Sequence, residues 1–370
     1  MKQKSWELFY LRVIRKHEKG IVPFFLRFFL WLLTFPYRLA VRVRNFAYDK
    51  GWLSRYTPPT PLVISIGNLV VGGAGKTPVT LMIAEAFYLE FPLAILARGY
   101  RSESERLTSP IVVCRGQGPT HPATYAGDEA YLMAENLPKS IVVVGRNRRE
   151  SSSLAAKMGA KLILLDDGMQ HRRVQRDKEV VVMDLNDPWG LGYFLPRGLL
   201  REGKSGLKRA DLIVLNHTGD HKAFEKLKIE ISKVTSAPVV GTIVEVVGVF
   251  DLANRPIALK GHKVGVFCGI AHPEYFVKTV KSLHAEIVGE HFLGDHHGLS
   301  LETLLAYSHK MRSVGADFLL CTEKDKVKLS GSLDESLPIA WVKMKLKVVE
   351  GKSDYDAFIA KGREVLKVQS

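Results

Sequence analysis

Apolar runs that alternate with segments of helical spacing predict an α/β fold for the first two thirds of the chain. The runs are short and nearly continuous, and they lie at residues 62–66, 93–96, 111–114, 141–144, 161–165, 180–183 and 212–215. Strands that are apolar on both faces are typical of a parallel sheet covered by helices on both sides. Ligands of such sheets bind beyond the carboxyl ends of the strands. Here these ends are followed by residues 67–77, 98–101, 166–171 and 184–190.

After the last of these runs the pattern changes. Residues 239–250 are β-branched and extended, and residues 338–348 are extended again. Between them lies a second, smaller α/β set that begins with the apolar run 263–268 and includes the later run 318–321. Two extended segments on either side of a smaller unit predict a two-stranded hinge between domains. A final helix at about 355–366 is expected to pack back on the first domain.

Length and composition support a division into parts. A globular chain of 370 residues, with 46% hydrophobic and 25% charged residues, exceeds one ordinary core. We therefore predict a first domain at 1–240, a smaller α/β domain that includes the hinge strands at 241–348, and a C-terminal helix within 349–370. Cys114, Cys268 and Cys321 lie too far apart for a metal knuckle and are expected to be reduced core thiols, as in a cytosolic protein.

A glycine-rich loop follows the first apolar run and precedes a predicted helix. Its residues are Gly72, Gly73, Ala74, Gly75, Lys76 and Thr77. Backbone N–H groups in such a loop point at anionic oxygens, so the pattern favours a nucleotide-phosphate site over a simple glycine turn. Lys76 would reach the β- and γ-phosphates, and the Thr77 hydroxyl would ligate Mg²⁺. The doubled glycine resembles the loop of metallochaperones and partitioning ATPases, although Val71 stands where that branch usually carries a lysine.

The net charge of +15 is concentrated near the N-terminus, where residues 1–56 hold twelve Lys/Arg and three Asp/Glu. The same stretch contains the apolar run 24–33, which is interrupted by Arg27, ends near Pro36 and is shorter than the ~20 residues of a spanning helix. We predict an amphipathic helix at about 21–35 that lies in the membrane interface, with basic residues on anionic headgroups. A helix docked on the core is the alternative. The interleaved Phe, Trp and Leu favour lipid over nucleic acid as the partner.

Pairs of acidic residues lie at the end of one predicted strand and at the end of one predicted loop. Asp166 and Asp167 end the apolar run 161–165, the usual place for a carboxylate that completes the Mg²⁺ site of a phosphate loop, although Asp-Asp-Gly is also a turn sequence. Asp128 and Glu129 end a long glycine-rich loop. Asp128 is either a helix N-cap or the carboxylate that a kinase needs to deprotonate the acceptor hydroxyl.

The paired histidines at 296 and 297 have no further ligands at zinc spacing. His296 is a candidate for holding and tuning a catalytic aspartate, and a surface position is the alternative.

Together these motifs closely resemble the tetraacyldisaccharide 4′-kinases, the lipid A 4′-kinases, over almost the whole chain. Met169 and Ala130 depart from the family pattern, which more often has phenylalanine and proline there. The resemblance rests on Gly67-Asn68, Gly72-Gly73-Ala74-Gly75-Lys76-Thr77-Pro78, Ala97-Arg98-Gly99-Tyr100, Gly127-Asp128-Glu129, Asp166-Asp167-Gly168-Met169-Gln170-His171, Leu195-Pro196-Arg197-Gly198, Leu200-Arg201-Glu202, Asp295-His296-His297 and Thr322-Glu323-Lys324-Asp325.

The resemblance implies a P-loop kinase domain, with ATP and Mg²⁺ as cofactors. It implies a peripheral or monotopic enzyme on the cytoplasmic face of the inner membrane. Such an enzyme moves the γ-phosphoryl group of ATP to the 4′-hydroxyl of a lipid disaccharide 1-phosphate. No protein partner is implied.

The resemblance also implies roles for individual residues. Asp128 would be the general base, paired with His296, and Arg201 would help to neutralise phosphate charge. Asp167 would lie beside the substrate or behind the direct metal ligands. The residues around Mg²⁺ would be Thr77, Glu129 and Asp166. The choices between Asp166 and Asp167, and between His296 and His297, stay open.

Two other classes are compatible with the glycine loop. A GTPase metallochaperone would need a base-specific lysine-aspartate motif, which Glu323-Lys324-Asp325 supplies only loosely, and Cys/His metal clusters, which are absent from the sequence. A membrane-bound module that uses a nucleotide as a switch would need no catalytic base.

Overall fold

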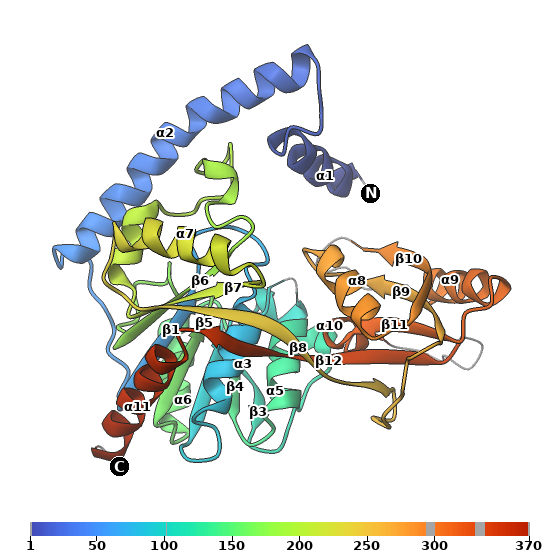
Figure 1. Cartoon of the computed structure of the whole chain (residues 1–370). Helices are drawn as coiled ribbons and strands as arrows, with labels where there is room; N and C mark the ends of the chain where they lie inside the picture. Colours follow the sequence, from blue (N-terminus) through green and yellow to red (C-terminus); the bar gives the residue numbers. More distant parts are fainter. Residues whose placement is uncertain (1, 101, 294–299, 330–336, 369–370) are drawn as a thin grey trace.

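The computed structural model describes residues 2–100, 102–293, 300–329 and 337–368. Within these residues the strands form one twelve-stranded sheet, in the order β10-β9-β11-β12-β8-β7-β6-β1-β5-β2-β4-β3 (Figure 1). Helices flank the sheet, so the predicted α/β class is confirmed.

The larger part of the sheet carries the phosphate loop. Its strands are β1 (Leu62–Gly67), β2 (Leu93–Ala97), β3 (Ile111–Arg115), β4 (Ile141–Val144), β5 (Leu162–Asp166), β6 (Lys178–Asp184) and β7 (Leu212–Asn216). They run parallel except β3, which pairs antiparallel with β4 at the edge. Every residue of β1, β5 and β7 is buried, which explains why these strands are apolar runs with no alternation.

At β1 the two faces of the sheet pack into two different hydrophobic cores. Leu62 and Ile64 of β1 point into a core with α3 and α5, whereas Val63 points into a core with α6. This division follows from the two-residue period of a strand. The helices and short 3₁₀ segments of this part are α3 (Lys76–Glu85), η1 (Glu103–Arg106), α4 (Ala123–Ala126), α5 (Asp128–Asn136), α6 (Arg148–Lys157), η2 (Gly190–Gly192), η3 (Lys204–Arg209), α7 (His221–Ser232) and α11 (Lys352–Val368).

The C-terminal helix α11 packs on the larger part. The Tyr355 hydroxyl donates to the Met82 carbonyl at 3.2 Å, and Arg363 donates to the Ala86 carbonyl at 2.8 Å. Gly362 lies so close to Phe87 that an added Cβ would be 2.9 Å from its ring.

Two long strands connect the larger part to a smaller unit. β8 (Val239–Asp251) begins beside β7, and β12 (Ile339–Glu350) begins beside β11, and the two pair antiparallel along their length. Their middle residues alternate between half-buried and exposed, so this stretch is a two-stranded ribbon. The elements of the smaller unit are β9 (Lys263–Cys268), α8 (Pro273–Ser282), β10 (Glu286–Phe292), α9 (Leu301–Ser313), β11 (Phe318–Thr322) and α10 (Glu323–Lys326). The predicted two-stranded connection is confirmed.

The N-terminal helices extend away from the sheet (Figure 1). They are α1 (Lys2–Ile14) and α2 (Ile21–Asp49). The helix expected at 21–35 therefore continues well beyond Pro36, and the expected end at this proline is wrong. Pro36 removes one backbone hydrogen bond, but contacts with the larger part hold the next turns. The Tyr37 hydroxyl donates to the Arg201 carbonyl at 3.3 Å, and the Asn45 amide donates to Glu202 at 2.9 Å.

Candidate active site

The phosphate loop joins β1 to α3 and is held from the end of β7. Gly75, the residue before α3, has φ +77°, in the left-handed region that favours glycine. A Cβ there would also lie 2.4 Å from Nδ2 of Asn216. That Nδ2 donates to the Ala74 carbonyl at 2.7 Å, and Oδ1 of Asn216 accepts from the Thr242 hydroxyl of β8 at 2.7 Å. The loop is thus linked by one buried side chain to the ribbon strand.

Gly72, Gly73, Ala74 and Gly75 form the loop itself, and Lys76 and Thr77 begin the first turn of α3. The unpaired N–H groups of a helix N-terminus favour an anion at this position. This placement agrees with the sequence interpretation of the loop as a phosphate cradle.

Asp167 contacts two cationic side chains beside the loop. Nη1 and Nη2 of Arg201 lie 3.1 and 2.8 Å from its two carboxylate oxygens, a bidentate pair. Nζ of Lys76 lies 3.6 Å from Oδ1 of Asp167 and 3.4 Å from Oδ1 of Asn68. Burial opposes ionisation of Asp167, but the charges of Lys76 and Arg201 outweigh it and hold the pKa of Asp167 well below its usual range. Asp167 is therefore an anion that orients two cations.

Asp166 has a different environment from its neighbour. Its side chain is 4% exposed, and Oδ1 accepts from the Thr80 hydroxyl at 2.9 Å. Burial, followed by the negative charges of Glu129 and Asp167, raises the pKa of Asp166 to about 7. Glu129 thus lies close enough for its charge to raise the pKa of Asp166. Thr77 lies in the first turn of α3, directly after Lys76. Two neighbouring carboxylates that repel one another, together with a hydroxyl, fit the oxygen ligands of a divalent cation.

Asp128 lies in the first turn of α5. Gly127, with φ +90°, is the cap residue, and no side-chain cap hydrogen bond is present there. The N-cap interpretation of Asp128 is therefore wrong, because its backbone is already helical. Its Oδ2 lies 3.3 Å from Nζ of Lys328, and Nζ of Lys324 lies 3.9 Å from Oε1 of Glu129. His296 and His297 lie outside the described residues, so their pairing with Asp128 stays a prediction.

The structure adds a buried arginine that the sequence interpretation missed. Arg148 begins α6 and is 3% exposed, and its Nη2 donates to the Asp166 carbonyl at 2.9 Å. Its Nε and Nη1 have no hydrogen-bond partner among the described residues. Burial lowers the pKa of Arg148 to about 10, and burial together with the Arg148 charge lowers the pKa of His171 to about 4. The available signal was the basic stretch 146–149, directly after a strand end.

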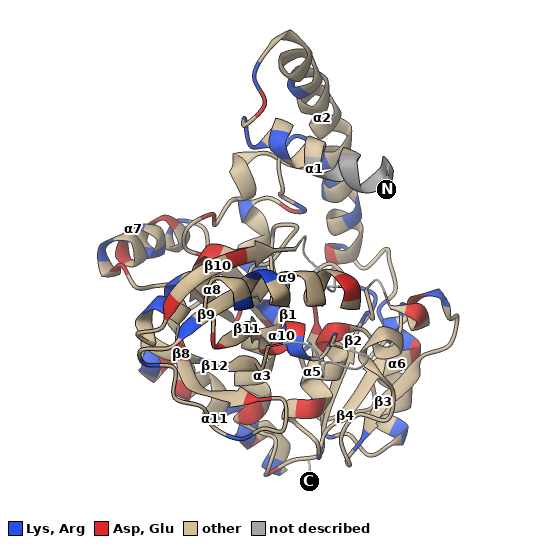
Figure 2. Ribbon diagram, turned by 90° about the vertical axis from the view of Figure 1, so that its right-hand side faces the viewer, with Lys and Arg blue, Asp and Glu red and all other residues tan. Residues whose placement is uncertain are grey.

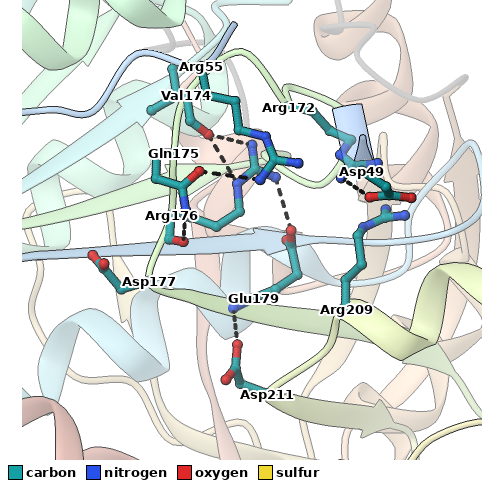
Figure 3. Close-up of a pocket in the computed structure, with 10 residues that line it drawn as sticks. All are labelled: Asp49, Arg55, Arg172, Val174, Gln175, Arg176, Asp177, Glu179, Arg209 and Asp211. Carbon is teal, nitrogen blue, oxygen red and sulfur yellow. Dashed lines mark hydrogen bonds and ion pairs between the residues drawn. The ribbon is translucent and has the colours of Figure 1, made fainter. Parts of the chain in front are cut away.

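A cavity of about 320 Å³ lies away from this cluster, where α2 ends (Figure 3). Its charged side chains pair with their neighbours. Arg172 contacts Asp49 at 2.5 Å, and Arg176 contacts Glu179 at 3.0 Å. The residues that line it are Asp49, Arg55, Arg172, Val174, Gln175, Arg176, Asp177, Glu179, Arg209 and Asp211. The cavity contains none of the predicted site residues, and its ion pairs fasten the end of α2 to the segment that follows Asp167.

Known proteins match this chain over nearly its full length. A family model described as tetraacyldisaccharide-1-P 4′-kinase matches residues 26–362. A tetraacyldisaccharide 4′-kinase of Chlamydia pneumoniae is 39% identical over 82% of this chain and 84% of its own. Another, of Anaeromyxobacter sp. (strain K), is 36% identical over 91% of this chain and 88% of its own.

A solved structure also matches. It is LpxK from Aquifex aeolicus, described as an "apo" form in complex with ATP, with a TM-score of 0.72 and 27% identity. The match covers 92% of this chain and 99% of the Aquifex chain. Sequence and fold thus agree, and the chain belongs to the tetraacyldisaccharide 4′-kinase family and is a lipid kinase.

Proposed function

We propose that this kinase transfers the γ-phosphoryl group of ATP to the 4′-hydroxyl of a lipid A disaccharide 1-phosphate at a membrane surface. The observation that carries the proposal is the cluster beside the phosphate loop. There Asp167 binds Arg201 in a bidentate pair and also contacts Lys76. Two oriented cations beside a phosphate cradle suit a transition state in which charge spreads over the transferred oxygens. The family match supports the acceptor, and the ATP in the Aquifex relative supports the donor.

We assign the steps to named groups. The loop N–H groups and Lys76 bind the phosphates, and Arg201 neutralises charge that develops on the transferred group. Asp128 takes the proton of the acceptor hydroxyl as a general base, and His296 supports it. A magnesium ion held by Thr77, Glu129 and Asp166 would add charge neutralisation. Among the described residues no three Asp, Glu, His or Cys side chains form a metal cluster, so phosphate and water oxygens would complete the magnesium shell.

We also propose that the chain divides into three parts. These are a kinase domain at 1–240, a smaller domain at 241–348 and, within 349–370, a helix that packs back on the first domain. Closure of the smaller domain over the loop would exclude water and limit wasteful hydrolysis of ATP. The ribbon strands β8 and β12 are the physical basis for such a movement.

We propose that α2 holds the enzyme on the cytoplasmic face of the inner membrane. By length and composition α2 could cross a membrane, and 11% of its most apolar window is buried. Contacts of Tyr37 and Asn45 fix the second half to the protein. The half before them, 21–36, is roughly 24 Å long, less than the ~30 Å hydrocarbon thickness. In Figure 2 α2 is largely uncharged with scattered basic bands, a pattern that suits an anionic interface.

A triple substitution, Phe24→Ser with Phe25→Ser and Phe28→Ser, tests this attachment. The three residues are between 52% and 62% exposed, and their burial in lipid would contribute to the apolar part of the binding free energy. We expect partition into phosphatidylglycerol-containing vesicles to weaken at least about tenfold. Co-sedimentation measures it. The control is Leu89→Ser with Ile229→Ser, which removes apolar side chains elsewhere on residues that are 78% and 58% exposed. Unchanged sedimentation of the triple variant would reject the anchor.

The reaction itself is tested with γ-³²P-labelled ATP and a panel of lipid disaccharide 1-phosphates. We expect label in the lipid product at the 4′ position, and none in acceptors in which the 4′-hydroxyl is blocked. If no label enters the lipid and the protein hydrolyses GTP rapidly, the result would favour a GTPase metallochaperone instead.

A further inference from the structure

Three lysines of the smaller unit reach across to α5. They occupy every second position of the segment that starts with α10. Nζ of Lys324 lies 3.9 Å from Glu129, and Nζ of Lys326 lies 2.8 Å from Glu135. Nζ of Lys328 lies 3.3 Å from Asp128. A fourth contact joins the Asn136 amide to Glu323 at 3.0 Å. Figure 2 shows acidic and basic residues meeting where α5 and α10 lie close together. The contacts thus run along α5 from its first turn to its end.

Lys328 differs from the other two in how firmly it is held. Its side chain is 9% exposed, and its ammonium lies between Asp128 of α5 and Asp325 of its own unit, 3.4 Å away. Asp325 is 3% exposed and is itself fixed. One oxygen accepts from the Gly269 N–H at 3.0 Å, and the other accepts from the Thr322 hydroxyl at 2.6 Å. A buried ammonium between two carboxylates has little freedom to move.

The same corner of the smaller unit touches the phosphate loop. An added Cβ on Gly73 would lie 2.6 Å from Cβ of Ala271. Ala271 comes two residues after Gly269, whose N–H fixes Asp325. The contact with the loop and the position of the Lys328 ammonium therefore depend on the same few residues of the smaller unit.

We propose that Lys328 is a positioning residue for Asp128. Its ammonium binds Oδ2, which sets the rotation of the carboxylate and so the direction in which Oδ1 meets the acceptor hydroxyl. Because the ammonium is carried by the smaller unit, Asp128 takes this orientation only when that unit is docked against the phosphate loop. The inference rests on the proposed role of Asp128 as the general base and adds a second residue through which the base is aligned.

Lys328→Met removes the charge and keeps nearly the same length. We expect kcat to fall about 10²-fold, the usual cost of a misplaced reacting group. KM for ATP should stay within about twofold, because the loop and Lys76 hold the phosphates. Steady-state kinetics with the lipid acceptor gives both values. Thermal unfolding shows whether the variant folds, and Lys328→Gln takes its place with the same expectation if it does not.

Lys326→Met is the matched control. It breaks an ion pair of the same kind across the same boundary, and it also removes the contact of Lys326 with the Trp341 ring at 4.6 Å. It leaves Asp128 untouched, so we expect kcat to change less than about threefold. If Lys328 only held the two units together, both variants would lose activity alike, and the proposal would be wrong.

The double variant with Asp128→Asn separates this inference from the function on which it rests. If Lys328 acts through Asp128, the double variant is no slower than Asp128→Asn alone. Multiplied losses would show an independent role and overturn the positioning proposal. Normal kcat of Lys328→Met beside an inactive Asp128→Asn would also overturn it, while leaving the base in place. Normal turnover of Asp128→Asn would instead reject the base itself.

Discussion

Asp128→Asn is expected to lower kcat by about 10²–10⁴-fold while leaving ATP binding intact. Asparagine has nearly the same shape and still accepts a hydrogen bond, but it does not take a proton from the acceptor hydroxyl. Asp128 lies in the first turn of α5, and its Oδ2 lies 3.3 Å from Nζ of Lys328, whereas Lys76 and Arg201 contact Asp167. Its loss therefore leaves the contacts of Lys76, Asp167 and Arg201 in place.

Single-turnover kinetics with a lipid acceptor and equilibrium titration with a fluorescent ATP analogue measure the two effects separately. Glu135→Gln is the matched control, because Glu135 lies at the other end of the same helix and pairs with Lys326 at 2.8 Å. That control should keep most of its activity. Near-normal turnover of Asp128→Asn would remove the base assignment, and loss of ATP binding would point to a structural role for this carboxylate.

Arg201→Met is expected to lower kcat by about 10²–10³-fold, the range for removing one donor that stabilises charge in a transition state. The change deletes both hydrogen bonds to Asp167 and the contact with the Asn68 carbonyl at 3.3 Å. Arg201→Lys should recover only a small part of the loss. A lysine keeps the charge but lacks the planar fork that binds both carboxylate oxygens.

The two Arg201 variants are compared in the same phosphoryl-transfer assay with saturating ATP. Lys204→Met is a suitable control, since it removes a nearby cation whose partner is Glu230. Full activity of Arg201→Lys would show that charge alone matters and that the bidentate geometry does not. Full activity of Arg201→Met would remove Arg201 from the mechanism.

Much of the fold could be predicted because its strands are buried on both faces. Each apolar run of the larger part became a strand whose ends differ from the run by at most two residues, as 161–165 became β5 and 180–183 became β6. The direction of β3 could not be predicted, because an apolar run carries no sign of orientation. The continuation of α2 beyond Pro36 depends on contacts with residues such as Glu202, which are remote in the sequence.

The site was predictable where chemistry follows a strand end. The phosphate loop and Asp166-Asp167 are of this kind, and the structure separates the two aspartates that the motif left equivalent. Burial opposes ionisation of both, but Lys76 and Arg201 hold the pKa of Asp167 low, whereas burial and the charge of Glu129 raise the pKa of Asp166. Asn216, Arg148 and Lys328 were missed because each acts through a partner far away in the sequence.

The ribbon of β8 and β12 restricts how the two parts of the enzyme can move. Its strands are hydrogen-bonded to one another, so stretching or sliding would break the ladder. The twist between neighbouring strands is larger in a two-stranded ribbon than in a wide sheet, so we expect this stretch to accommodate a change of twist. We therefore expect the closure proposed above to be mainly a rotation about the long axis of the ribbon. Thr242 of β8 bonds Asn216, which bonds the phosphate loop. We therefore expect a rotation of the ribbon to be transmitted through Asn216 to the loop that binds the nucleotide phosphates.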